Sequence, residues 1–276
     1  MGMALRSLLY HGRMLSHSRQ TVVAILAFFL ASQSMGFSSA DDPLEGLPGS
    51  VVDQLKEHLP GIVVDRAKDT KPLREAKDWL PLSQVDFVFE RTGDGNRTTR
   101  WSITPAKKVP GQDEKVQGWT LVQSNGTTRF LSMDEKGVIQ SQFTVNHPNG
   151  LLIKLDPPEP VVHPIVAEAK PEEISVSVSD LGSPNDVQYS GKVKCTWKDL
   201  GGFRVKVPAG EFKTRLLWVH YKGSVGPASV DGSRLLFVAP GTGPIAFSDD
   251  RDISAFLFFN DDTAHAGMLR KVSRGG

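Results

Sequence analysis

Short runs in which apolar and polar residues alternate fill most of the chain after residue 84. The clearest run covers residues 203–221, FRVKVPAGEFKTRLLWVHY, where three apolar residues alternate with Arg204 and Lys206. Alternation with a period of two is typical of a strand that buries one face. In the Pro-Ala-Gly break that follows, Pro208 fixes a turn dihedral and Gly210 can adopt a positive φ. The pattern therefore predicts a β-hairpin.

A second hairpin is predicted at residues 234–247, RLLFVAPGTGPIAF. An apolar run ends at Pro240, and two glycines provide the turn before Ile245 begins the next strand. Together the two turns give a structural signature of Pro208, Gly210, Pro240, Gly241 and Gly243.

The same reasoning predicts a series of hairpins upstream. The expected strands are QVDFVFER at 84–91, TTRWSI at 98–103, QGWTLVQ at 117–123, TRFLSM at 128–133 and VIQSQFTV at 138–145. Glycine-containing turns separate them at 93–96, 124–126 and 134–137. Turns about every 8 to 12 residues favour an antiparallel arrangement over βαβ units. We expect a mainly β fold, an antiparallel sheet curved into an open half-barrel or a sandwich, with one or two short N-terminal helices.

Residues 41–77 have a different pattern and form an expected N-terminal arm. Ser50 precedes VVDQLKEHL and could cap a short helix that Pro60 ends, and LREAKDWL at 73–80 could form a second helix. The alternative is a loosely ordered arm, because helices this short need a surface to pack on. Residues 78–276 are expected to form one antiparallel β domain.

A proline-rich break interrupts this domain at residues 156–173, DPPEPVVHPIVAEAKPEE. Its five prolines cannot donate hydrogen bonds to a sheet. The segment is either a linker between domains or a crossover within a single sheet. We favour the crossover, because Val161, Val162, Ile165 and Val166 are too apolar for a solvated linker. The later run ISAFLFFN, residues 253–260, is apolar enough to predict a strand buried on both faces.

The N-terminus has the pattern of a secretory signal peptide. Three arginines and no acidic residue precede an apolar run at 21–31, and small residues follow, with cleavage expected after Ala40. An uncleaved anchor is the alternative, but the run is shorter than the roughly 20 residues of a membrane span. Translation could instead begin at Met14. We expect a periplasmic or secreted protein with peripheral membrane association or none after cleavage.

Charge and cysteine content narrow the functional classes. The net charge is +1, and removing residues 1–40 with their three arginines changes it to −2. No basic patch is visible, so we expect no nucleic-acid partner. The single cysteine, Cys195, cannot form an intrachain disulfide, and its place in an alternating strand predicts a small buried apolar residue.

Sequence motifs for catalysis, phosphate binding or metal binding are absent, so we expect no cofactor, no metal and no recognisable catalytic residue. Five aspartates, Asp249, Asp250, Asp252, Asp261 and Asp262, flank ISAFLFFN and are interpreted as solvated strand ends. His220 alternates with Trp218 and could face the interior, but a structural role is the commoner one for a lone histidine on a strand.

Two motifs carry a family resemblance. VKVPAGEF at 205–212 and FVAPGTGPIAF at 237–247 resemble the paired hairpin and turn, V-P-A-G-x-F and [W/F]-x-A-P-G-x-G, of a family of uncharacterised exported bacterial β-proteins with a domain of unknown function. DWLPLSQVDFVFE at 78–90 is similar to that family's opening, although the usual Gly-x-x-Trp is missing, and FLSMDEKGVI at 130–139 fits its next hairpin. The resemblance implies an exported antiparallel β domain and no catalytic residues.

The supply of aromatic residues on the predicted strands suggests a binding function. A non-enzymatic envelope protein could enclose a lipid-like or other apolar ligand in its curved sheet, with Trp101, Trp119, Trp197, Trp218 and Phe237 as candidate cavity residues. Filling of the protein core is the alternative role for these side chains. The other functional hypotheses are an assembly factor that binds another envelope protein by strand addition and an exported hydrolase with an unrecognised site.

Overall fold

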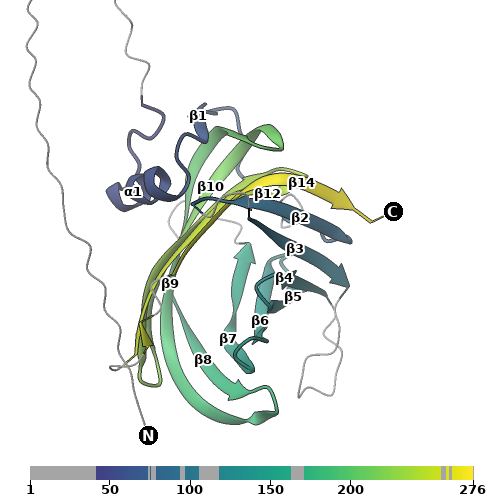
Figure 1. Cartoon of the computed structure of the whole chain (residues 1–276), viewed down its shortest axis with the longest axis vertical. Helices are drawn as coiled ribbons and strands as arrows, with labels where there is room; N and C mark the ends of the chain where they lie inside the picture. The colour runs from purple at the N-terminus through teal and green to yellow at the C-terminus, as the bar shows by residue number, and fades with distance from the viewer. Residues whose placement is uncertain are drawn as a thin grey trace, which may run out of the picture. The chain divides into compact units, whose positions relative to one another are not determined.

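Twelve of the described strands form one closed antiparallel β-barrel in a computed structural model of the chain (Figure 1). The structure describes residues 42–73, 75, 79–93, 97–105, 118–162, 171–255, 259–260 and 263–275, without the side chains of 162 and 252–264. The chain divides after Ala40, and every described residue belongs to the part that follows. The predicted signal peptide, the centre of the predicted 73–80 helix and the side chains of ISAFLFFN lie outside the described residues.

Strands that are consecutive in the sequence are neighbours in the barrel, so the chain forms an up-and-down meander. The short β13 pairs only with β12, and β1 pairs with β9 beside the barrel. The elements are α1 (Gly49–His58), β1 (Val63–Arg66), β2 (Val85–Arg91), β3 (Thr98–Pro105), β4 (Trp119–Gln123), β5 (Thr127–Met133), β6 (Ile139–Asn146), β7 (Leu151–Val162), β8 (Glu172–Asp180), β9 (Ser183–Val207), β10 (Gly210–Val225), β11 (Ala228–Ala239), β12 (Gly243–Ala255), β13 (Phe259–Asn260) and β14 (Thr263–Arg274).

Pairing between β14 and β2 closes the barrel. Gly267 pairs with Arg91 at one end of this ladder and Arg274 pairs with Val85 at the other, with a β-bulge between them. The expectation of an antiparallel, mainly β fold is confirmed, whereas the open half-barrel and the sandwich are wrong. The alternation of apolar residues encodes strands and local hairpins, but the closing pair joins the two ends of the β domain, which no local pattern specifies.

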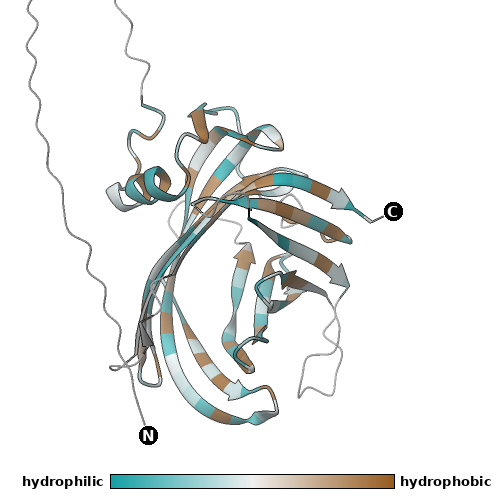
Figure 2. Ribbon diagram, in the orientation of Figure 1, coloured by the Kyte–Doolittle hydropathy of each residue, from teal (hydrophilic) through white to brown (hydrophobic). Residues whose placement is uncertain are grey.

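The predicted hairpin at 203–221 is confirmed as β9 and β10. Phe203, Val205 and Val207 are buried, while Arg204 and Lys206 are more exposed, as the alternation required. The turn residues also adopt the expected backbone: φ is 130° at Gly210, 70° at Gly241 and 100° at Gly243. Figure 2 shows the same alternation of apolar and polar residues along β6, β7 and β8.

The proline-rich segment contributes to the barrel wall in its first part. β7 extends to Val162 and includes Pro157, Pro158 and Pro160, and Pro160 is paired with Gln140 of β6. Register shifts in this ladder accommodate residues that lack an amide donor. Residues 163–170 lie outside the described part of the chain.

Helix α1 packs against the outer face of the wall formed by β11 and β12. Val51, Leu55 and the following Leu59 are buried against it. Gln54, also buried, donates to Ser248 Oγ at 3.0 Å and accepts from Ser233 Oγ at 2.7 Å. The helix begins at Gly49 and has no side-chain cap, so the predicted cap at Ser50 is wrong.

The segment after α1 is held against β9 and β10 by pairing and charge. β1 pairs antiparallel with β9, and Arg204 of β9 donates from Nε to both oxygens of Asp65 at 3.1 Å. Arg215 of β10 binds Asp199 and donates to the Thr70 carbonyl at 2.9 Å. The described part of the N-terminal arm is therefore packed on the barrel.

The two glycines of the β11–β12 turn provide a matched test of this packing. A Cβ on Gly243 would lie 3.0 Å from Pro81 Cδ and 3.1 Å from Phe87 Cζ, whereas a Cβ on Gly241 would meet nothing within 4 Å. Both positions have positive φ, which costs a non-glycine residue about 1–2 kcal/mol. We expect Gly243→Ala to reduce the free energy of unfolding, measured in urea, by more than Gly241→Ala. Equal losses would contradict the close packing at Gly243.

Candidate functional site

The barrel encloses a cavity of about 530 Å³. A barrel of about eight strands is filled by side chains or holds one small ligand, and one of 16 leaves a channel. Twelve strands therefore leave an interior that side chains do not fill completely. The side chains that decide its chemistry come from most of the strands, and they are Arg91, Trp101, Leu121, Gln123, Arg129, Glu159, Trp197, Val219, Arg234, Leu236, Phe247, Asp249, Arg251 and His265.

Aromatic side chains form one wall of the cavity. Phe247 of β12 and Trp101 of β3 have ring centroids 4.6 Å apart, and Phe89 of β2 contacts both rings at 5.2 and 4.9 Å. Phe247 also covers Gly267, where a Cβ would lie 2.8 Å from the ring. Glycine at this position is what allows the aromatic ring to lie flat against β14.

Charged side chains lie beside this aromatic wall, two residues further along β12 and on its neighbouring strands. Register pairs Val219 with Arg234, Arg234 with Asp249, and Asp249 with His265 across four strands, β10, β11, β12 and β14. Residues two apart on a strand share a face, so Asp249 and Arg251 follow Phe247 into the interior. The inner surface therefore changes from apolar to charged within two residues of β12.

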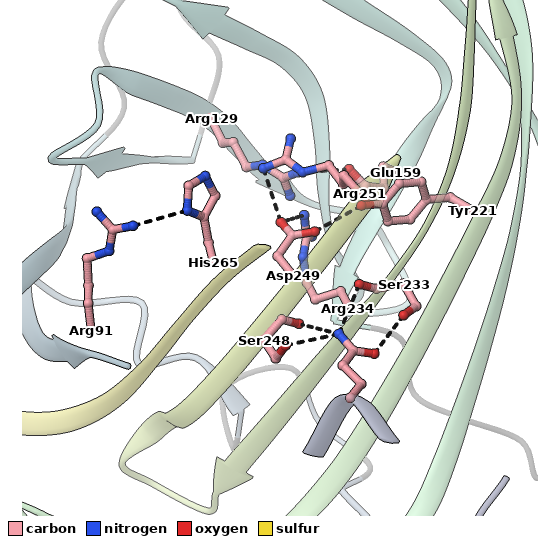
Figure 3. A network of polar contacts seen from close by, with 11 residues as sticks. Arg91, Arg129, Glu159, Tyr221, Ser233, Arg234, Ser248, Asp249, Arg251 and His265 are labelled. Atoms are coloured by element: carbon pink, nitrogen blue, oxygen red, sulfur yellow. Dashed lines mark hydrogen bonds and ion pairs between the residues drawn. The ribbon is translucent and has the colours of Figure 1, made fainter. Parts of the chain in front are cut away.

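Asp249 is the centre of a buried polar network (Figure 3). Tyr221 donates to its Oδ1 at 2.9 Å, Arg234 donates to its Oδ2 at 3.0 Å, and Arg251 lies 3.4 Å from Oδ2. Burial raises the pKa of Asp249, but attraction by Arg234 and Arg251 and the two hydrogen bonds outweigh it, so the pKa falls to about 2. The carboxyl group is therefore ionised at neutral pH.

Tyr221 approaches Asp249 across a glycine. A Cβ on its cross-strand partner Gly232 would lie 2.8 Å from the tyrosine ring, so only glycine leaves room for the ring to lie over β11. Burial, and then repulsion from Asp249, raise the pKa of the Tyr221 hydroxyl. Tyr221 is therefore a neutral donor to the carboxylate.

A second ion pair lies opposite, between β5 and β7. Arg129 is 3.5 Å from Glu159, and each side chain is 17% exposed. Attraction by Glu159 raises the pKa of Arg129, whereas burial and repulsion by Arg234 and Arg251 lower it, and the net direction is downward. A guanidinium remains charged in any case. The repulsion shows that these three arginines share one region of the cavity.

Arg91 and His265 are the remaining charged or titratable side chains of the described cavity. Arg91 Nη2 lies 3.4 Å from His265 Nδ1, and Figure 3 shows the pair beside the Asp249 network. Four arginines and two carboxylates thus line the described cavity.

The predicted cavity residues divide into two groups. Trp101 and Trp197 line the cavity, and Trp197 is buried. Trp218 also borders the cavity, but its ring stacks on His220 with centroids 5.8 Å apart. Trp218 pairs with Leu235, and Leu235 pairs with Ser248, which lies on the face that α1 covers. Its ring therefore belongs to the outer face.

Trp119 and Phe237 lie elsewhere. Trp119 packs against the main apolar core, and Phe237 is fully buried with its ring at 6.0 Å from Phe203. Neither is among the described residues that line the cavity. The residues of the turn signature lie in the β9–β10 and β11–β12 turns, away from it.

Sequence reasoning missed the charged cavity residues. Asp249 was expected at a solvated strand end, but it is 8% exposed, because the strand continues past it and its side chain faces inward. Asp250 is exposed as expected. A signal was present: Phe247, Asp249 and Arg251 are spaced at i, i+2 and i+4, which places two charges on the same face as a buried aromatic residue.

Other reactive groups are sequestered or satisfied. Ser248 Oγ lies 2.8 Å from His58 Nδ1, but the serine is fully buried beneath α1 and cannot reach a substrate. His220 is on the outer face with Asp231 at 3.0 Å. Cys195 is buried, as predicted, and burial raises the pKa of its thiol to about 12.

The described residues offer neither a metal site nor a membrane-spanning helix. They contain no group of three or more His, Cys, Asp or Glu side chains that could hold a metal ion. They also contain no helix with the length and apolar character of a membrane span.

Comparison with known proteins gives two distant structural matches. An exported-protein candidate with a YmcC-like fold from Bacteroides fragilis has a TM-score of 0.38 and 10% identity, and the match covers 71% of this chain and 98% of the other. A lipoprotein candidate from Parabacteroides distasonis has a TM-score of 0.36 and 9% identity, covering 71% of this chain and 97% of the other. No family model and no curated protein matches the chain. The resemblance of its hairpin motifs to an uncharacterised exported family therefore stays a prediction.

The Asp249 network predicts an acid-sensitive contribution to stability. The pKa of Asp249 is lowered from 3.8 to about 2, so its stabilisation is present above pH 4 and is lost as the pH falls towards 2. The linked change is roughly 2 kcal/mol. At pH 7, Asp249→Asn removes the counter-ion of two half-buried arginines and should lower the free energy of unfolding by about 2 kcal/mol or more.

The control is Asp250→Asn, which changes the exposed neighbour. Urea denaturation between pH 7 and pH 2 should show the Asp249→Asn deficit shrinking as the wild-type carboxyl group becomes protonated. A deficit that is the same at both pH values, or equal in the two variants, would contradict the role of Asp249.

Proposed function

We propose that this protein is an exported, non-enzymatic binding protein that holds a lipid-like or other apolar small molecule inside its barrel. The observation that carries this proposal is the cavity of about 530 Å³ with Trp101, Phe247 and Leu236 in its wall. Ligand pockets commonly measure about 300–1,000 Å³ and combine apolar walls with a few placed polar groups. Export rests on the signal-peptide pattern of residues 1–40.

The chemistry of the cavity favours binding over catalysis. Asp249 is held ionised by two arginines and a tyrosine, so it is a weak base and has no proton to donate at neutral pH. Ser248 and His58, the serine and histidine whose side chains lie 2.8 Å apart, are under α1, away from the cavity. These arrangements support a carrier more than a hydrolase.

Closure of the barrel also weighs against strand addition. Each of the twelve barrel strands described is hydrogen-bonded on both sides, and the four-residue β1 stands at the end of the strand order. An assembly factor that adds a partner's strand needs a long unprotected edge. Binding of a ligand inside the barrel is therefore the function that we prefer.

Filling the cavity should weaken ligand binding without changing the outer surface. Gln123 lines the cavity, whereas the adjacent Val122 is 40% exposed. We expect Gln123→Trp to weaken binding of the neutral fluorophore N-phenyl-1-naphthylamine by at least about tenfold, because the new side chain occupies ligand volume. Val122→Trp should bind the fluorophore like the wild type.

Fluorescence titration measures both affinities, and thermal unfolding shows whether each variant is folded. Failure of the wild type to bind the fluorophore would contradict the proposed function. Equal weakening by both substitutions would place the binding site outside the barrel.

A further inference from the structure

Three arginines that approach Asp249 and Glu159 outnumber these carboxylates in the described cavity. We define the arginine cluster as Arg129, Arg234 and Arg251, which come from β5, β11 and β12. Only two carboxylates, Asp249 and Glu159, line the same described cavity. Burial of excess charge is costly unless a counter-ion accompanies it.

The carboxylates are already engaged by members of the cluster. Both oxygens of Asp249 are used, one by Tyr221 and the other by Arg234 and Arg251. Glu159 faces Arg129 at 3.5 Å, a loose contact for a charge-assisted hydrogen bond. Each guanidinium carries five N–H donors, so the cluster has more donors than these two carboxylates can accept.

Arg251 shows this surplus most directly. Its Nη2 lies 3.4 Å from the Asp249 carboxylate, and its Nε is buried with no hydrogen-bond acceptor among the described residues. Arg129 is close enough to Arg251 for mutual repulsion, and Figure 3 shows the two side chains next to each other. Together they offer donors to a single anionic group.

The apolar wall begins immediately beside the cluster. On β12, Phe247 lies two residues from Asp249, and on β11, Leu236 lies two residues from Arg234. The rings of Trp101 and Phe247 have centroids 4.6 Å apart. An elongated ligand could therefore place a charged end at the arginines and an apolar body against the aromatic rings in one continuous cavity.

We infer that the ligand is an acidic amphiphile, with a carboxylate or phosphate head group bound by Arg129 and Arg251 and an apolar body packed against Trp101 and Phe247. This inference rests on the proposed function and specifies its ligand class. Carboxylate and phosphate oxygens match the planar fork of a guanidinium and would supply the acceptors that Arg251 lacks.

Competition against bound N-phenyl-1-naphthylamine tests the head group separately from the apolar body. The competitors are dodecanoate, dodecyl phosphate, dodecanol and inorganic phosphate, each kept below micelle-forming concentrations and used with the full chain. We expect the two acidic amphiphiles to displace the probe about ten- to a hundredfold more effectively than dodecanol, the factor for hydrogen bonds to charged groups. Inorganic phosphate should displace little.

Substitutions at Arg251 test the assignment of the residue. Arg251→Gln should remove most of the preference for acidic competitors while leaving dodecanol unchanged, and Arg251→Lys, which keeps the charge but loses Nε, should retain only part of it. Arg270→Gln is the matched control, because Arg270 is an exposed arginine on β14 that does not line the cavity. A preserved affinity for the neutral probe shows that each variant keeps its cavity.

The outcomes separate the two proposals. Equal displacement by dodecanoate and dodecanol would overturn the acidic head group and leave the proposed function standing. Inorganic phosphate as effective as dodecyl phosphate would overturn the amphiphile in favour of a free anion. A preference for acids that survives Arg251→Gln and a matching Arg129→Gln would overturn the assigned residues. No binding of the neutral probe to the wild type would instead remove the proposed function itself.

Discussion

Closure of the sheet by β14 and β2 is the constraint on which the rest of the structure depends. Every other pair in the barrel joins strands that follow each other closely in the chain, whereas this ladder joins residues 267–274 to residues 85–91. Without it the sheet would have two long edges and one open side. With it, side chains that alternate inward on twelve strands enclose a common volume.

The closed wall explains why one face of the interior can be charged. Asp249, Arg234 and Tyr221 lie on adjacent strands whose register is fixed by the barrel, so their side chains lie within hydrogen-bonding distance of one another. Buried charges are stable only when they are paired and hydrogen-bonded. The buried Nε of Arg251 has no acceptor among the described residues, and this is the basis of the proposed anionic ligand.

The sequence predicted much of the local structure and little of the site. Alternation and turn chemistry identified the β9–β10 hairpin, because the burial of Val205 and the positive φ of Gly210 both follow from the local sequence. Closure of the barrel was not predicted, because the pairing of β2 with β14 produces no pattern in the local sequence of either strand. Among the five aromatic residues predicted for a cavity, Trp101 and Trp197 line it, whereas Trp119 and Phe237 pack in the core, since an aromatic residue in a strand fits either environment.

The charged residues of the cavity were not predicted for a different reason. An aspartate at the end of an apolar run is usually solvated, and Asp249 differs only because its strand continues for six more residues and its partners Arg234 and Tyr221 come from neighbouring strands. Such a network is a property of the three-dimensional register. The spacing of Phe247, Asp249 and Arg251 is the one local sign of it.

The central claim is that the inside of the barrel holds an acidic amphiphile, and the position of a labelled ligand tests it most directly. Crystals of the protein with a fatty acid brominated at the end of its chain would locate the bromine by anomalous scattering. The account predicts bromine inside the barrel on the side of Trp101 and Phe247, with the carboxylate at Arg251. Bromine found only on the outer surface, with the cavity unchanged, would contradict it.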